Sequence, residues 1–293
     1  MGHVFSWVSL AVVAAIFQAA MPLVSEHFKV NTMHMIVWLR IISVAAVSPL
    51  VMLYGLPSDP IYYLSIVGVI IMVAVTDLIY FGSAARNGAG VTTRVQPFEV
   101  FATFFLWTIV TPSLMQSYFD TPWRSLWMIL ALSGCVYFAL RMQHHDISRR
   151  TFRTMLPVIG LGALMIVLSK TAMNHSPPHS GVYGYIFLQG MGVLLVYGIL
   201  MRFWPAKFPT MRKDKAVLKA GLFMAICSLG HLFSKYYAFK MVVNPAYVTV
   251  VGLTAPLWVW LYYKLVKRPD NDDVVAGFGV VICAVVLIIL TRL

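Results

Sequence analysis

Seven ionisable residues stand inside long apolar stretches of this chain, where such side chains are rare. The first half contains Arg40, Asp77, Arg94 and Glu99, and the second half contains Lys170, His231 and Lys235. At the centre of a membrane helix a charged residue costs about 2.5 to 3.5 kcal/mol on insertion scales, so each should face a partner, a cavity or an interface. These residues are therefore the first candidates for the chemistry of the protein.

The four charged residues of the first half are two cations and two anions. We expect ion pairs between Arg40 and Asp77 and between Arg94 and Glu99, either in a buried network that acts as a gate or in a site for substrate or protons. Glu99 is the best candidate for a proton carrier, because a low dielectric favours a neutral carboxyl group. Asp77 is the second candidate. If Arg94 or Arg40 pairs tightly with Glu99, that carboxylate stays charged instead.

The second half places cations in its apolar stretches but no carboxylate. His231 and Lys235 are four residues apart and share one helix face. Together with Lys170 they could attract a carboxylate or a phosphate. The alternatives are that the lysines extend their ammonium groups to the lipid headgroups and that the histidine is a packed hydrogen-bonding residue.

These residues must be positioned by membrane helices. A helix needs about 20 apolar residues to cross a bilayer, and the chain has ten such stretches, at residues 5–24, 34–54, 61–85, 91–111, 123–142, 155–174, 182–201, 216–238, 246–266 and 274–291. Mean hydropathy is +0.82. Long apolar runs exclude the alternating pattern of barrel strands. The sequence predicts an all-α integral membrane protein with ten transmembrane helices.

Composition and motifs argue against several other classes. The net charge of +12 comes from basic clusters that flank the spans, so we expect no nucleic acid partner. Three cysteines inside spans indicate no disulfide or zinc site. Motifs of metalloproteases, nucleotide-binding loops and serine hydrolases are absent from the sequence. We expect no enzyme, metal or cofactor, and interpret residues 144–146, His-His-Asp, as part of a solvated linker.

The distribution of basic residues predicts the orientation. Fifteen of the 22 Lys and Arg residues lie at the odd-numbered loops, and only three lie on the opposite side. Since Lys and Arg are retained on the cytoplasmic side, the odd loops should face the cytoplasm and both termini the outside. A bacterial inner membrane is the expected location.

The two halves of the chain have matching patterns. Residues 18–21 (Gln-Ala-Ala-Met) lie opposite residues 170–173 (Lys-Thr-Ala-Met) at a shift of 152, and the same shift superposes five spans on five. Because five is odd, the half at 147–293 must be inverted relative to the half at 1–146. In inverted repeats the substrate binds near the midplane between the halves. We therefore add Gln18, the counterpart of Lys170, to the candidate site.

Other polar and aromatic residues of the spans could line such a site. They are Trp7, Tyr80, Tyr183, Tyr185, Gln189, Tyr197, Tyr236 and Trp258.

Several motifs resemble the drug/metabolite transporter superfamily, in its ten-helix form with two EamA-like repeats. They are residues 38–40 (Trp-Leu-Arg), 84–90 (Ala-Ala-Arg-Asn-Gly-Ala-Gly) with Pro97, 237–240 (Tyr-Ala-Phe-Lys) with 244–246 (Asn-Pro-Ala) and Pro256, and the glycine-rich stretch 275–281. The resemblance covers the whole chain and implies a transporter fold, but it does not identify the substrate.

Two functions follow as hypotheses. The first is a secondary transporter or exporter of a small anionic metabolite, driven by protons or by exchange, in which Arg40, Lys170 and Lys235 orient the anion and Glu99 carries the proton. The second is a translocator of a lipid or lipid-linked headgroup. Membrane lipid is an expected partner in both, and a homodimer remains open.

Overall fold

The computed structural model describes residues 2–87, 96–141, 149–204, 214–267 and 274–290, and every regular element in these ranges is a helix. The prediction of an all-α fold with apolar helices suited to a membrane is confirmed at this level. The helices are α1 (Gly2–Phe28), α2 (Thr32–Tyr54), α3 (Pro60–Asn87), α5 (Gln96–Val110), α6 (Pro112–Asp120), α7 (Pro122–Arg141), α8 (Arg149–Asn174), α9 (Pro178–Phe203), α10 (Lys215–Met241), α11 (Ala246–Gly252), α12 (Ala255–Leu265) and α13 (Val274–Leu290).

Each predicted span coincides with a helix, except that the span at 246–266 consists of α11 and α12 in succession. Among the described residues, seven helices are long and apolar enough to cross a membrane, or eight if α5 and α6 form one broken span. The bend between α5 and α6 is 99°. Helix α6 was not predicted from the sequence. The arrangement of ten spans as two inverted repeats remains a prediction.

Helix boundaries follow local rules. Prolines begin α3, α6, α7 and α9, where a missing backbone N–H costs no hydrogen bond. The side chains of Asn31 and Asp214 cap α2 and α10 by accepting hydrogen bonds from the backbone N–H groups of His34 and Ala216, at 3.1 and 2.8 Å. Helix α2 ends at Tyr54 and is followed by Gly55, whose φ of +70° suits glycine.

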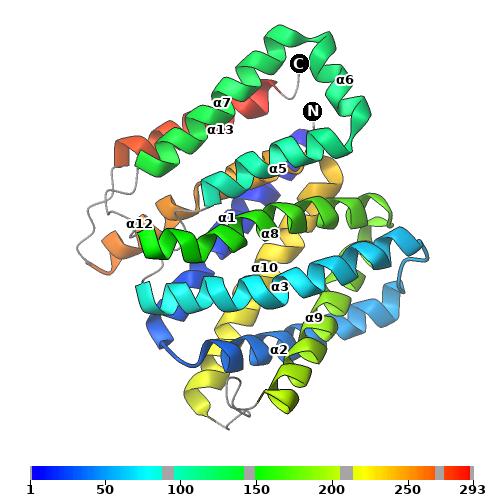
Figure 1. Ribbon diagram of the computed structural model, residues 1–293, viewed down its shortest axis with the longest axis vertical. Coiled ribbons are helices and arrows are strands. Elements are labelled where there is room, and N and C mark those ends of the chain that lie inside the picture. Colours follow the sequence, from blue (N-terminus) through cyan, green and yellow to red (C-terminus); the bar gives the residue numbers. More distant parts are fainter. Residues whose placement is uncertain (1, 88–95, 142–148, 205–213, 268–273, 291–293) are drawn as a thin grey trace.

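Four helices form the centre of the molecule. Helix α1 packs along α10, and α3 packs along α8. Helices α2 and α9 pack against each other at one end of this group, and α7 and α13 form a pair at the other end (Figure 1). The chain crosses the molecule repeatedly: the connection between α1 and α2 lies at the left of Figure 1 and the connection between α2 and α3 at the right.

The pair of α7 and α13 is held together by close packing at two glycines. A Cβ atom on Gly134 would lie 2.8 Å from the sulfur of Cys283, and a Cβ atom on Gly279 would lie 2.5 Å from the ring of Phe138. Small residues let helix backbones approach closely where lipid removes the hydrophobic driving force between helices. Each helix therefore supplies one glycine that accommodates a side chain of the other.

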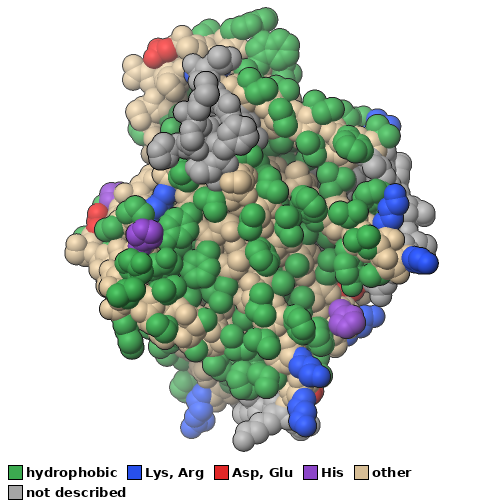
Figure 2. Space-filling view, turned by 180° about the vertical axis from the view of Figure 1, so that it is seen from behind, with side chains coloured by type: hydrophobic (Ala, Val, Ile, Leu, Met, Phe, Trp, Pro, Cys, Tyr) green, Lys and Arg blue, Asp and Glu red, His purple; other side chains and the backbone are tan. Residues whose placement is uncertain are grey.

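The outer surface of the bundle is largely apolar. Exposed side chains include Met52, Leu64, Ile109 and Leu195, which are 86, 75, 67 and 66% accessible. Figure 2 shows this apolar surface across the middle of one face, with most of the Lys and Arg side chains at the right and lower edges. An apolar outer surface with basic residues kept to its margins is what we expect of a multi-pass membrane protein.

Candidate functional site

A cavity of about 180 Å³ lies between the central helices. It is somewhat larger than an engineered protein cavity of about 150 Å³ that holds benzene. We call it the central cavity. Its polar lining comes from both halves of the chain: Gln18, Arg40, Thr76, Asp77, Tyr80, Glu99, Ser169, Tyr185, Gln189, Ser228, His231, Lys235 and Tyr236. Valine, leucine, isoleucine, methionine and phenylalanine side chains complete the wall.

A second, smaller cavity adjoins the first. Its volume is about 30 Å³, and helices α1, α5, α8, α10 and α11 line it. We call it the side cavity. Gln18, Glu99, His231 and Lys235 line both cavities and so lie at the boundary between them. Four of the residues singled out from the sequence are thus brought to one place by helices far apart in the chain.

Arg40 and Asp77 form the predicted ion pair. The guanidinium Nη2 of Arg40 donates a hydrogen bond of 2.5 Å to the carboxylate Oδ2 of Asp77. Arg40 is only 5% exposed, and its Nε has no hydrogen-bond partner among the described residues. The pair joins α2 to α3 at the wall of the central cavity.

His231 is held by the backbone of α1. Its Nδ1 lies 2.9 Å from the carbonyl oxygen of Ala14. A carbonyl can only accept a hydrogen bond, so Nδ1 must carry the proton. In the neutral ring Nε2 is then an acceptor, and an approaching group with an N–H or O–H could donate to it.

Lys235 follows His231 by one helical turn on α10. Its ammonium nitrogen lies 5.5 Å from the centre of the Phe239 ring, within the range of a cation–π contact. Within the described ranges, no carboxylate oxygen approaches this nitrogen to within 4.0 Å. Lys235 therefore forms no ion pair within 4.0 Å among the described residues, and it lines both cavities together with Glu99.

Glu99 lies in the first turn of α5. Its carboxyl group lies against the backbone of α8 at Gly162. Across the parts of the chain that the structure covers, no ion pair reaches this carboxyl group. The predicted partner Arg94 lies outside the described residues, as do residues 144–146.

Lys170 does not line either cavity. Its ammonium donates hydrogen bonds of 2.6 and 2.8 Å to the carbonyl oxygens of Phe239 and Val242, at the end of α10. It is only 3% exposed. The repeat match placed Lys170 opposite Gln18, but only Gln18 reaches the central cavity. We therefore leave Lys170 out of the site built below.

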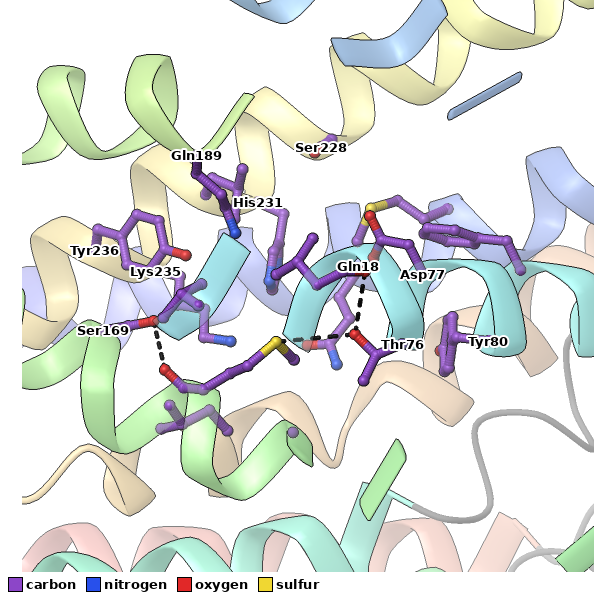
Figure 3. Close-up of a pocket in the computed structure, with 18 of the residues that line it drawn as sticks. Gln18, Thr76, Asp77, Tyr80, Ser169, Gln189, Ser228, His231, Lys235 and Tyr236 are labelled. Carbon is purple, nitrogen blue, oxygen red and sulfur yellow. Dashed lines mark hydrogen bonds between the residues drawn. The ribbon is translucent and has the colours of Figure 1, made fainter. Parts of the chain in front are cut away.

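Gln189 was one of several polar candidates in the sequence, and its position in the structure distinguishes it from the others. It lies on α9, is 3% exposed, and its Oε1 has no hydrogen-bond partner among the described residues. In Figure 3 the side chains of Gln189, His231 and Lys235 converge on one part of the central cavity, and Thr76, Asp77 and Tyr80 lie at the other end.

Three small hydroxyl residues of the lining, Thr76, Ser169 and Ser228, were not predicted. Ser169 and Thr76 donate to carbonyl oxygens of their own helices, at 2.6 and 3.4 Å. Such bonds let hydroxyl residues occur anywhere in a membrane helix, so residue type alone carries no signal. Tyr80, Tyr185, Gln189 and Tyr236 of the predicted polar and aromatic set do line the cavity, whereas Trp7, Tyr183, Tyr197 and Trp258 do not.

Comparison with known proteins identifies the fold alone. No protein-family model and no curated protein matches the chain. Several solved structures are similar, among them one described only as the crystal structure of a protein. It superposes with a TM-score of 0.66 over 98% of both chains, at 13% sequence identity. The whole chain thus has a fold found in a solved protein of very different sequence.

Proposed function

We propose that the chain is a secondary transporter of a small anionic metabolite that works by alternating access. The observation that carries the proposal is the central cavity, which is lined by helices of both halves and by Lys235, whose ammonium group has no carboxylate oxygen within 4.0 Å among the described residues. A site of this kind, mostly apolar with a few placed polar groups, is typical of small-molecule binding.

The helix packing supports the two inverted halves. Suppose that α1 corresponds to α8, α2 to α9, α3 to α10, and α5 to α11. Each contact between two helices should then be matched by a contact between the two corresponding helices. Helix α1 packs on α10, and α8 packs on α3. Helix α2 packs on α10, and α9 packs on α3. Helix α1 packs on α11, and α8 packs on α5. The motifs that resemble the drug/metabolite transporter superfamily favour the same plan, and we propose membership of that family.

The cavity residues have distinct roles in this proposal. Lys235 binds the anionic group of the substrate, with Gln18, Gln189 and His231 as hydrogen-bonding groups around it. Arg40 and Asp77 neutralise each other and form a gate between α2 and α3. Glu99, which borders both cavities, takes up the coupling proton.

Contacts between the halves close one end of the molecule. The side chain of His175 bonds to Asp59 at 2.9 Å, the Tyr62 hydroxyl donates to the carbonyl of Gly181 at 2.8 Å, and Trp107 donates to the carbonyl of Val243 at 3.0 Å. All three contacts lie at the end predicted to face outward.

The central cavity extends the other way. Its lining residues Met21, Phe81 and Val158 are near the predicted cytoplasmic ends of α1, α3 and α8. We infer that this is the inward-facing conformation, and that outward opening breaks the contacts at the closed end.

The test is transport by the purified protein in proteoliposomes. We expect uptake of labelled small carboxylates or of phosphate, with accumulation that collapses when a protonophore is added. Lys235→Gln should reduce uptake by about 10- to 100-fold, because hydrogen bonds to charged groups contribute about 1.5 to 3 kcal/mol. Lys219→Gln, on the exposed face of the same helix, is the matched control and should transport normally.

Two outcomes contradict the proposal. One is that neither carboxylates nor phosphate move in either direction. The other is that labelled phospholipid crosses the bilayer while these soluble anions do not, which would favour the lipid translocator. Glu99→Gln separates exchange from proton coupling: exchange of anions should continue, and accumulation driven by a proton gradient should be lost.

A further inference from the structure

A glycine of α8 lies directly against the carboxyl group of Glu99. A Cβ atom built on Gly162 would be 2.7 Å from Cδ, 2.8 Å from Oε1 and 3.0 Å from Oε2 of Glu99. Carbon atoms in contact are normally about 3.5 to 4.0 Å apart. Any side chain at this position would therefore displace the carboxyl group.

Gly162 lies in the middle of a long helix, where glycine is the poorest helix former after proline. Gly160, two residues earlier in the same helix, has no heavy atom within 4 Å of the position of its Cβ. The close contact is thus specific to Gly162 and not a general property of α8.

The carboxyl group that occupies this space lies at the boundary of the two cavities. Glu99 lines both the central and the side cavity, while Gly162 lines the central cavity. A methyl group at residue 162 would therefore move the carboxyl group at the boundary between the two cavities. We propose that Gly162 is a positioning residue that holds the carboxyl group of Glu99 where it can exchange a proton with one cavity and respond to a ligand in the other.

A similar contact occurs at the packing interface that the repeat makes equivalent. A Cβ atom on Gly252 of α11 would be 3.1 Å from Oε1 of Gln18 on α1. In each case a polar side chain at the cavity boundary lies against a glycine of the neighbouring helix. The closer contact is at Gly162, and only there is the side chain a carboxyl group.

This inference rests on the proposed function, in which Glu99 carries a proton. The experiment measures protonation of Glu99 directly, by infrared spectroscopy of the carboxyl C=O band in purified protein from about pH 4 to about pH 10. Glu99→Gln identifies the band by its loss. The variants are Gly162→Ala, Gly160→Ala as the matched control, and Gly162→Ala combined with Glu99→Asp, whose shorter side chain leaves room for the added methyl group.

We expect Gly162→Ala to shift the midpoint of this titration by at least ~0.5 pH unit and Gly160→Ala to leave it unchanged. The double variant should titrate as Glu99→Asp alone does, because the methyl group then meets no carboxyl group. The inference is overturned if Gly162→Ala titrates like the natural protein, or if the double variant differs from Glu99→Asp.

Folding of the variants is checked first, by size-exclusion chromatography and thermal unfolding. If Gly162→Ala does not fold but the double variant does, the contact between residue 162 and Glu99 is supported. The inference then stands if the double variant titrates as Glu99→Asp does, and fails if it does not. If neither folds, the conflict is with another group and the inference fails. A failure of the proposed function would show in the natural protein, as a carboxyl band that does not titrate or as absent transport.

Discussion

At the scale of single residues, the ion pair of Arg40 and Asp77 follows from the cost of burying charge. Two opposite charges at similar depth in neighbouring helices were expected to pair, and the structure shows the pair. Which lysine lines the central cavity could not be predicted. Lys170 and Lys235 look alike in the sequence, and only the packing of α8 and α10 determines that one contacts carbonyl groups and the other a cavity.

Replacing one partner of the Arg40–Asp77 pair should lower the unfolding free energy more than replacing both partners. Asp77→Asn leaves the buried guanidinium without its countercharge, and we expect a loss of about 3 to 5 kcal/mol of unfolding free energy. The double variant Arg40→Gln with Asp77→Asn should lose clearly less. Reversible unfolding in detergent measures the cycle, and additive losses would show that the two side chains are not coupled.

Asp59, in the connection before α3, gives a pH-dependent test at the closed end. The hydrogen bond with His175, and then the backbone N–H of Ile61, hold the pKa of Asp59 below its ordinary value of 3.8. Stability from a lowered pKa is present above that ordinary value and is lost as the pH falls through the folded-state pKa.

Asp59→Asn should therefore lower Tm slightly at neutral pH. The difference from the natural protein should shrink as the pH falls below about 3.8 and disappear once the pH is below the lowered pKa of Asp59. Tm measured against pH in detergent is the readout. A difference that persists unchanged in acid would show that the ionised state of Asp59 is not the source of the stability.

At the scale of helices, two lysines link the ends of α8 and α10 reciprocally. Lys170 of α8 donates to the carbonyls of Phe239 and Val242 at the end of α10. Lys240 of α10 donates to the carbonyls of Met173 and Ser176 at the end of α8, at 2.5 and 2.6 Å. The last carbonyls of a helix have no partner within it, so each lysine satisfies the end of the other helix.

Lys170→Met should weaken this junction without changing the site. Buried carbonyls that lose their donor cost about 1 to 3 kcal/mol, so Tm should fall, while the affinity for a transported anion should stay the same. Isothermal calorimetry and thermal unfolding together test this. A large loss of affinity in a folded variant would contradict this and show that Lys170 contributes to anion binding.

Helix positions were more predictable than helix breaks. Apolar length located α1 to α3 and α8 to α10, because a bilayer sets that length. Residues 112–120 were too polar to be predicted as a span, yet they form α6, which begins at Pro112 and has no buried residue. The break between α11 and α12 at residues 253–254 also lacks a clear signal, since Pro256 is compatible with the start of a new helix or with a kink.

At the scale of the whole molecule, the account requires that both halves enclose one cavity that opens to each side of the membrane in turn. The duplicated pattern of spans predicted where such a cavity would lie. Its lining was less predictable, because Gln189 and Ser228 differ from other polar residues of the spans only in the direction that their helices give them.

Accessibility of a single thiol in the cavity tests this claim most directly. Ser228 lines the central cavity and is 6% exposed, so Ser228→Cys changes little more than one atom. It is placed in a background in which Cys135, Cys227 and Cys283 are replaced by alanine. Ile226→Cys, on the same helix and 54% exposed on the apolar surface, is the control.

A membrane-impermeant thiol reagent is added to sealed vesicles of either orientation. The account predicts that Ser228→Cys reacts from both faces of the membrane, that a transported anion slows both reactions, and that Ile226→Cys does not react. Reaction from one face only, or from neither, would contradict a cavity that opens alternately to the two sides.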